Sequence, residues 1–264
     1  MAMSPRKRAQ RIRLVQYAVL VLVVLLVAIV TDWAQISEAF LDVVVARKML
    51  PEVLTVALKN TVIYTVLGFT LGLFLGLVLA LMRLSSVGPY RWLATGFIEF
   101  FRGVPALVVF IALSFGIPTA FPGREIPFSP YGTVTVALGL VGGAYMAETI
   151  RAGIQAVPKG QLEAARSLGM SQGWAMRAVV VPQAFRIVLP PLTNELILLT
   201  KDSSLVYVTG LTLTTFELTK YGRETLNNTA SMTSLVVIAL CYLLITVPLS
   251  IVVRRMESRA ERAR

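Results

Sequence analysis

Long runs of uncharged, mostly apolar residues alternate with short charged segments along this chain. Six stretches of about 14 to 29 residues contain no Asp, Glu, Lys or Arg, apart from Glu195 in the fifth. Because about 20 apolar residues span the hydrocarbon core of a bilayer, each stretch predicts one membrane helix. The predicted spans are residues 14–31, 60–82, 97–117, 131–151, 189–210 and 232–253. The expected fold class is therefore all-α, a polytopic membrane protein with about six transmembrane helices.

The charges between these spans are distributed unevenly. Alternate segments hold 17 Lys/Arg against three Asp/Glu, whereas the other segments hold six against seven. The basic segments are residues 1–13, 83–96, 151–188 and 254–264, and the others are 32–59, 118–130 and 211–231. Cytoplasmic loops carry the excess of Lys and Arg, so both termini are predicted to be cytoplasmic in a multi-pass protein of the cell membrane. The net charge of +11 follows this alternation, which indicates the lipid bilayer as the partner and excludes nucleic acid.

Composition narrows the chemistry. Hydrophobic residues make up 56% of the 264 residues and charged residues 15%, compared with about 45–50% and 25% in soluble globular proteins. The chain has no histidine and a single cysteine, Cys241, which excludes a histidine-based triad and a Cys/His zinc site. It also lacks the Gly-x4-Gly-Lys-Ser/Thr loop that binds ATP. We expect no enzyme activity, no cofactor and no metal, and an energy source outside this chain.

The first span has two interpretations. Five basic residues precede it, as in a signal peptide, but the apolar run from Leu14 to Val30 is long for one and lacks a small-x-small cleavage site. An uncleaved anchor is favoured. The expected organisation is a basic tail, first helix and outer linker in residues 1–52, a permeation domain in 53–253, and a basic cytoplasmic tail in 254–264.

Two details concern the second span. Gly68, Gly72 and Gly76 recur every fourth residue, which predicts close packing against another helix. Before them, Pro51 is expected to start a short amphipathic segment, with Val53 and Ala57 on one face, that lies at the membrane surface.

The connection from Arg151 to Leu189 is far longer than two neighbouring membrane helices need. Pro158 favours a helix start, and Gly169 is placed to end that helix in a left-handed conformation. Ser171 is expected to cap a second helix that ends at Pro182. Two short helices are thus predicted to protrude from the bilayer.

This connection carries a motif, Gly160-Gln-Leu-Glu-Ala-Ala-Arg-Ser-Leu-Gly169, followed after nine residues by Val179-Val-Val-Pro182. It resembles the EAA loop of ABC importer permeases, with matching spacing across residues 158–182. Further segments resemble the polar amino-acid permeases of that superfamily. They are Phe101-Arg-Gly-Val-Pro105, Ala144-Tyr-Met-Ala-Glu-Thr-Ile-Arg151, Pro182-Gln-Ala-Phe-Arg186, Leu189-Pro-Pro-Leu192 and Lys201-Asp-Ser-Ser-Leu205.

The resemblance implies a type I ABC importer permease fold and a set of partners. Such a permease pairs with a second permease chain, identical or paralogous, and docks its EAA loop into a cytoplasmic ABC ATPase subunit. An extracytoplasmic binding protein delivers a polar amino acid or a similar small zwitterion. The residues that the resemblance assigns to ATPase coupling are Gln161, Glu163, Ala164, Ala165 and Gly169.

Polar residues inside the predicted spans are candidates for the substrate pathway. Lys201 and Asp202 lie near the middle of the fifth span, where a charge is costly unless it is paired or hydrated. They either line the pathway or neutralise each other, and both interpretations stay open. Ser203 is expected to bind backbone groups if the helix breaks there. Tyr145 and Asn194 are candidates for neutral hydrogen bonds to substrate or between helices.

Two charged pairs, Glu99 with Arg102 and Glu148 with Arg151, have the i to i+3 spacing that puts each pair on one helix face. Ion pairing within the protein and contact with substrate are both open for them. A zwitterion needs an acceptor for its ammonium and a donor for its carboxylate, and Glu148 is the first candidate for the ammonium. The alternative function is an ion-coupled secondary transporter of small polar solutes, although two related halves with matching broken helices are not evident.

Overall fold

The computed structural model describes residues 5–262, with side chains described for 10–258, and the outer parts of both predicted basic tails lie outside this range. The described part is helical and contains no strand. Its α-helices are α1 (Pro5–Val30), α2 (Trp33–Phe40), α3 (Val43–Glu52), α4 (Leu58–Leu84), α5 (Gly88–Gly103), α6 (Ala106–Ile111), α7 (Ile117–Ala120), α8 (Tyr131–Gln155), α9 (Lys159–Ser167), α10 (Gln172–Ala175), α11 (Val181–Asp202), α12 (Leu218–Thr229) and α13 (Thr233–Arg262).

Five helical stretches in the described range are long and apolar enough to cross a membrane. They are Gln10–Val30, Trp33–Leu84, Tyr131–Gln155, Gln172–Val208 and Thr233–Ser258. A sixth is present if α5 and the stretch Ala106–Ala120 count as one bent span. The predicted fold class of about six membrane helices is therefore confirmed, and the third predicted span is the one that differs.

That third span, predicted as one helix over 97–117, is broken. Helices on either side of Val104 and Pro105 meet at an angle of 102°. Proline removes a backbone donor and pushes the residue before it into an extended conformation, and Val104 has a ψ of 131°. The expectation of a straight helix is wrong because Pro105 ends α5.

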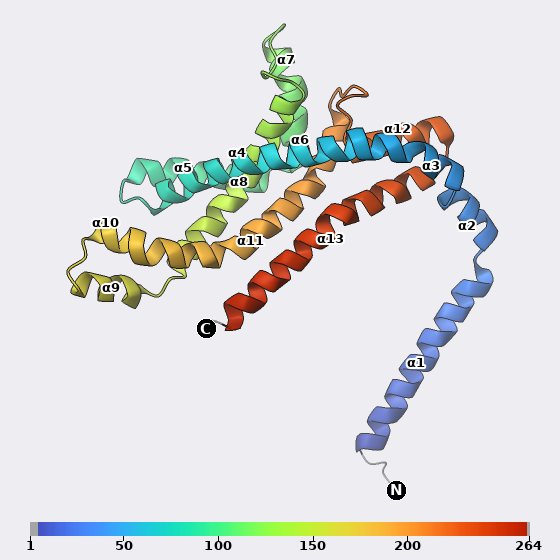
Figure 1. Cartoon of the computed structure of the whole chain (residues 1–264), viewed down its shortest axis with the longest axis horizontal. Helices are drawn as coiled ribbons and strands as arrows, with labels where there is room; N and C mark the ends of the chain where they lie inside the picture. Colours follow the sequence, from blue (N-terminus) through green and yellow to red (C-terminus); the bar gives the residue numbers. More distant parts are fainter. Residues whose placement is uncertain (1–4, 263–264) are drawn as a thin grey trace.

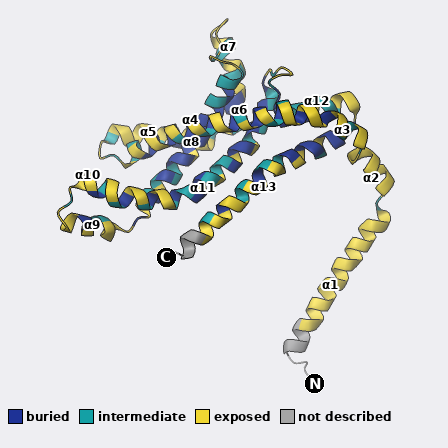
Figure 2. Cartoon of the chain, viewed as in Figure 1, coloured by how far each residue is buried: buried dark blue, intermediate teal, exposed yellow. Residues whose placement is uncertain are grey.

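The bundle has two ends, which Figure 1 separates. The turn between α4 and α5 lies at the left, with helices α9 and α10 and the end of α13 below it, and we call this the α9 end. Helix α7 lies at the top and α12 toward the upper right, and we call this the α7 end. Buried residues concentrate on α4, α8 and α11, whereas α1 is exposed along its described length (Figure 2).

The largest helix interface joins α4 to α8. A methyl group added at Gly72 would lie 3.2 Å from the backbone nitrogen of Gly143, and one added at Gly68 would lie 2.5 Å from Leu138 Cβ. Lipid supplies no hydrophobic drive between helices, so close backbone approach provides the packing energy. The predicted role of the glycine stripe is confirmed.

The segment expected at the membrane surface belongs to a long continuous helix. Pro51 lies inside α3, and a π-helical turn over Val53–Ala57 joins α3 to α4. Residue 53, the expected domain boundary, is the first residue of that turn. Val53 and Ala57 are fully buried beside Leu218. The apolar face of this segment packs on α12 and α13, and its location at the membrane surface stays a prediction.

Candidate functional site

A cavity of about 390 Å³ opens where the break between α5 and α6 meets α8 and α11. We call it the inner cavity. Three charged side chains line it, Arg102 from α5 and Glu195 and Asp202 from α11. Its other lining residues are Gly103, Val104, Pro105, Ala106, Val141, Gly142, Tyr145, Leu198 and Leu199. A broken helix is tolerated at membrane depth where it lines a cavity, which is the position of the break between α5 and α6.

Arg102 is placed by its neighbour on α8. Its guanidinium carbon lies 5.7 Å from the centre of the Tyr145 ring, in a cation–π contact. Such a contact leaves the N–H donors of the guanidinium free for an anionic group. Arg102 therefore supplies a positive charge at the edge of the inner cavity.

The two carboxylates come from one face of α11. Glu195 and Asp202 are seven residues apart, which is two helical turns, and both side chains are partly buried. Neither forms an ion pair among the described residues. Their oxygens therefore remain available as acceptors within the inner cavity.

The other candidates on α11 lie elsewhere. Lys201 and Asn194 are exposed and do not line the inner cavity. Ser203 is fully buried, and its hydroxyl donates to the carbonyl oxygen of Thr200 at 2.8 Å, where α11 gives way to a 3₁₀ turn over Ser203–Val208. The expectation that Ser203 binds a backbone group is confirmed.

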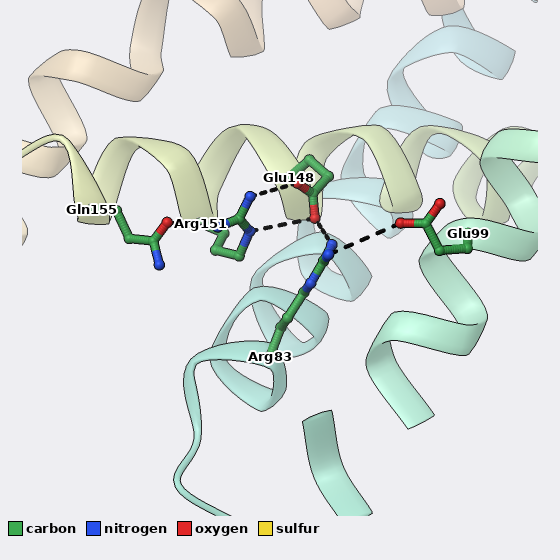
Figure 3. Close-up of polar contacts among 5 residues, drawn as sticks. All are labelled: Arg83, Glu99, Glu148, Arg151 and Gln155. Atoms are coloured by element: carbon green, nitrogen blue, oxygen red, sulfur yellow. Dashed lines mark hydrogen bonds and ion pairs between the residues drawn. The ribbon is translucent and has the colours of Figure 1, made fainter. Parts of the chain in front are cut away.

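A second polar group centres on Glu148, which follows the cavity residue Tyr145 by three positions on α8; Figure 3 shows its side chains. Glu148 binds Arg83 with one carboxylate oxygen and Arg151 with the other, the latter at 2.8 Å. Arg83 also lies 3.9 Å from Glu99. Arg151 in turn donates to Gln155 at 2.5 Å. We call these residues the ion-pair cluster.

The contacts of the cluster show which of the two predicted charged pairs forms an ion pair within the protein. Glu148 and Arg151 are paired with each other as their spacing predicts. Glu99 and Arg102 are not, because Arg83 lies near Glu99 and Arg102 lies over Tyr145. Glu148 is outside the inner cavity, so its contact with a substrate ammonium stays a prediction.

The protruding element at the α9 end has the predicted turn. Gly169 has φ +85°, and the amide of Met170 donates to the carbonyl of Ala165 at 3.2 Å, which closes the end of α9. Ser171 caps α10 with its hydroxyl. The predicted end at Pro182 is wrong. A π-helical turn over Met176–Val180 makes α10 continuous with α11, and proline is tolerated there as the second residue of α11.

The exposed surface of α9 is smaller than the sequence suggests. Gln161, Glu163 and Ala164 are exposed, whereas Ala165 is buried. Gln161 also accepts a hydrogen bond from Gln183 of α11 at 3.3 Å, which holds α9 against the membrane helix. Any docking surface on α9 is therefore formed without the side chain of Ala165.

Residues 68–262 match the family described as binding-protein-dependent transport system inner membrane component. The chain belongs to this family of permeases. The match includes the inner cavity, the ion-pair cluster and α9, and it confirms the resemblance found in the EAA loop. The permease is thus a transport subunit of a binding-protein-dependent importer, and the family assignment gives no support to the alternative of an ion-coupled carrier.

Relatives of the permease extend the match. It is 38% identical over 207 residues to the probable glutamine ABC transporter permease protein GlnM of Bacillus subtilis (strain 168), covering 77% of this chain and 91% of that one. Identity is also 38% over 160 residues with the arginine transport system permease protein ArtQ of the same strain, covering 61% and 70%.

Solved structures agree. The permease superposes with a TM-score of 0.74 and 36% identity on a chain of an amino acid ABC transporter with histidines, covering 83% of this chain and 99% of that chain. A chain of the MetNI methionine ABC transporter matches with a TM-score of 0.54 and 18% identity, covering 86% and 99%, which supports the fold alone.

Two charged residues of these sites were not among the candidates from the sequence. Glu195 interrupts an apolar run, and its spacing of seven from Asp202 is the signal that identifies a shared face. Arg83 follows the second predicted span as one of many basic residues near a membrane surface. Its pairing with Glu148 joins residues 65 positions apart, and no local pattern reports such a contact.

Proposed function

We propose that this permease translocates a polar amino acid or a similar small zwitterion, with ATP hydrolysed by a separate cytoplasmic subunit. The observation that carries the proposal is the inner cavity, which presents one guanidinium and two carboxylates. The named substrates of the related permeases, glutamine and arginine, agree with this chemistry.

The charges of the inner cavity match both ends of an amino acid. Arg102 offers donors to the α-carboxylate, and Glu195 and Asp202 offer acceptors to the α-ammonium or to a basic side chain. Two carboxyl groups against one guanidinium give the cavity more acceptors than cations, which favours neutral and basic amino acids over acidic ones. We infer that Tyr145 orients Arg102. Asn194, Lys201 and Ser203 belong to the substrate pathway outside the wall of the inner cavity.

The proposed partners follow from the fold and the family. A substrate-binding protein delivers substrate at the α7 end, and a second permease chain, identical or paralogous, completes the pathway. The ATPase subunit docks at the α9 end, where the exposed residues Gln161, Glu163 and Ala164 surround the turn at Gly169. This orientation puts both termini in the cytoplasm, and the excess of Lys and Arg on the α9 side supports it.

Coupling between the two ends runs through α8. This helix lines the inner cavity at Tyr145, joins the ion-pair cluster at Glu148, and ends at Gln155, three residues before Pro158 caps α9. A force on α9 is therefore delivered to the cavity wall by a continuous helix.

The experiment is uptake by proteoliposomes that contain the importer co-purified with its ATPase, supplied with binding protein and labelled glutamine, arginine or glutamate. Arg102→Gln and Asp202→Asn are expected to lower uptake about tenfold or more, because a charged hydrogen bond contributes about 1.5–3 kcal/mol. Arg91→Gln, which changes an exposed arginine of the same helix α5, is the matched control. Unchanged uptake in both cavity variants would contradict the proposal.

A further inference from the structure

A second cavity, of about 210 Å³, lies at the α7 end between α7 and the start of α8. We call it the outer cavity. Four hydroxyl groups and one carboxylate line it, those of Ser114, Ser129, Thr133, Thr209 and Glu125. Glu125 is its single charged lining residue, so the outer cavity, unlike the inner one, has an acid without a base.

Two of the four hydroxyl groups are arranged as acceptors. Thr133 donates to the hydroxyl of Ser129 at 3.4 Å, and Thr209 donates to the carbonyl of Val206 at 2.8 Å. A hydroxyl has one donor and two acceptor positions. The donors of these two threonines are already in hydrogen bonds, so only their lone pairs are free to bind a ligand. Together with the carboxylate of Glu125, they suit a group with several donors and a positive charge.

Ser114 provides independent support. Its hydroxyl oxygen is the one buried side-chain nitrogen or oxygen in the described part of the chain that lacks a hydrogen-bond partner. An unpaired buried hydroxyl is costly, and a specific explanation is needed where one occurs. Because Ser114 lines the outer cavity, a rotation of its side chain would bring the hydroxyl to a ligand there, which would supply the missing partner.

The two cavities share one wall. On α8, Thr133 of the outer cavity precedes Val141 of the inner cavity by eight residues, or about 12 Å at 1.5 Å per residue. On the helix after Pro105, Ala106 of the inner cavity precedes Ser114 by eight residues. The same elements thus carry a polar site near the α7 end and another deeper in the bundle.

We propose that the outer cavity is an entry site that binds a primary ammonium group before substrate reaches the inner cavity. The site rests on the proposed function, because the ammonium belongs either to the amino acid or to a lysine of the docked binding protein. Glu125 supplies the charge, and the hydroxyls of Ser114, Thr133 and Thr209 accept the N–H donors.

Thiol labelling tests the proposal without requiring transport. Ser114→Cys is introduced together with Cys241→Ala, which removes the single native cysteine, and the complex is labelled in detergent. Two methanethiosulfonate reagents are compared, one with an aminoethyl group and one with a sulfonatoethyl group, and their rates are divided by the rates with free cysteine. We expect a two- to fivefold preference for the ammonium reagent, the range of an exposed ion pair.

Glu125→Gln is expected to remove this preference, whereas Glu38→Gln, which changes an exposed carboxylate on α2, is expected to leave it unchanged. Equal corrected rates for the two reagents, with Glu125 present, would overturn the proposal. A preference that survives Glu125→Gln would also overturn it. Thr133→Val provides a second variant, in which the preference should shrink because one acceptor is lost.

Protection experiments identify the source of the ammonium. Glutamine that slows labelling, while N-acetylglutamine does not, supports the substrate as the source. Protection by binding protein in the absence of amino acid supports a lysine of that partner, and no protection by either overturns the entry site. An importer that labels selectively but takes up no amino acid would contradict the proposed function and leave the ammonium site intact.

Discussion

Glu148 is the residue on which the ion-pair cluster depends, since both of its carboxylate oxygens bind arginines (Figure 3). Its side chain is 21% exposed and that of Arg83 24%, so water screens the pair only in part. The cluster fixes the end of α8 against α4, directly before the chain enters α9. Loss of the cluster should therefore change the free energy of unfolding and the coupling of ATP hydrolysis to transport.

We predict that Glu148→Gln lowers uptake mainly by loosening this attachment. In a double-mutant cycle with Arg83→Gln, the interaction free energy of unfolding in detergent should be about 1 kcal/mol. The substrate concentration for half-maximal uptake should stay unchanged, while ATP hydrolysed per substrate transported should rise.

The control cycle combines Arg83→Gln with Glu163→Gln on α9, a residue outside the cluster, and the two effects should add. A higher half-maximal concentration for Glu148→Gln, together with additive stability changes for Arg83 and Glu148, would favour direct contact between Glu148 and the substrate ammonium instead.

At the scale of elements, α12 is held by a buried carboxylate at its first turn. Glu217 is fully buried and accepts hydrogen bonds from the backbone N–H groups of Thr219 and Lys220, each at 2.6 Å, and from the Tyr242 hydroxyl at 3.1 Å. Burial raises the pKa of Glu217 to about 7, although these hydrogen bonds oppose the shift. The loop before it is held to α4, where Asn60 donates to the carbonyls of Thr214 and Phe216.

The sign of the resulting pH dependence follows from linkage. The pKa in the folded state lies above the ordinary value of 4.5, so the folded protein binds this proton more tightly than the unfolded chain. The stabilisation is complete below pH 4.5 and is lost as the pH rises through 7. We predict that the free energy of unfolding falls by roughly 3 kcal/mol across that range because of this group.

Thermal unfolding in detergent, followed by intrinsic fluorescence at pH 6 and pH 8, measures the effect. The wild-type protein should unfold at a lower temperature at pH 8, and Glu217→Gln should reduce the difference. Glu224→Gln, on the same helix, should retain it. A difference of equal size in the Glu217 variant would assign the pH dependence to other groups.

Sequence patterns predicted those elements whose causes are local. Apolar run length located the membrane helices, and the glycine spacing on α4 predicted its packing on α8, because both effects act within one helix face. The break at Pro105 was missed, since run length alone ignores the donor that proline removes. The continuity of α10 with α11 was missed for a related reason, because a π-helical turn precedes Pro182 and leaves it as the second residue of α11, where proline is tolerated.

The candidate site was predictable only in part. Arg102, Tyr145 and Asp202 were identified as polar residues within apolar spans, and the structure brings them together around one cavity. Lys201, the sequence neighbour of Asp202, is exposed and outside the cavity wall, because adjacent helical residues point about 100° apart. The role of Arg83 could be found only from the tertiary structure, because the packing of α4 on α8 is what brings it to Glu148.

At the scale of the whole molecule, α8 joins the sites into one path. From the α7 end it lines the outer cavity at Thr133, then the inner cavity at Val141 and Tyr145, and then holds the ion-pair cluster at Glu148. Its large, mostly buried interface with α4 makes it a rigid body within the bundle. A displacement of α9 would therefore be transmitted along this helix toward both cavities, which is the coupling that the proposed function requires.

The last prediction concerns the point where such a movement enters the permease. Gly169→Asp should abolish association with the ATPase while membrane insertion is retained, because Gly169 is exposed in the turn after α9. A Cβ atom added there meets no atom within 4 Å, so we expect the effect to come from backbone strain or from charge at the docking surface.

Three substitutions separate these two causes. Asn and Asp tolerate the left-handed conformation of φ +85° almost equally and differ mainly in charge, whereas Val is uncharged and strains that conformation by about 1–2 kcal/mol. Loss of ATPase co-purification with Asp but not with Asn would show that the docking surface rejects negative charge. Loss with Val and retention with Asn would show that the turn geometry is what the ATPase recognises. Retention with all three, at normal membrane levels, would mean that the force of ATP hydrolysis enters elsewhere than this turn.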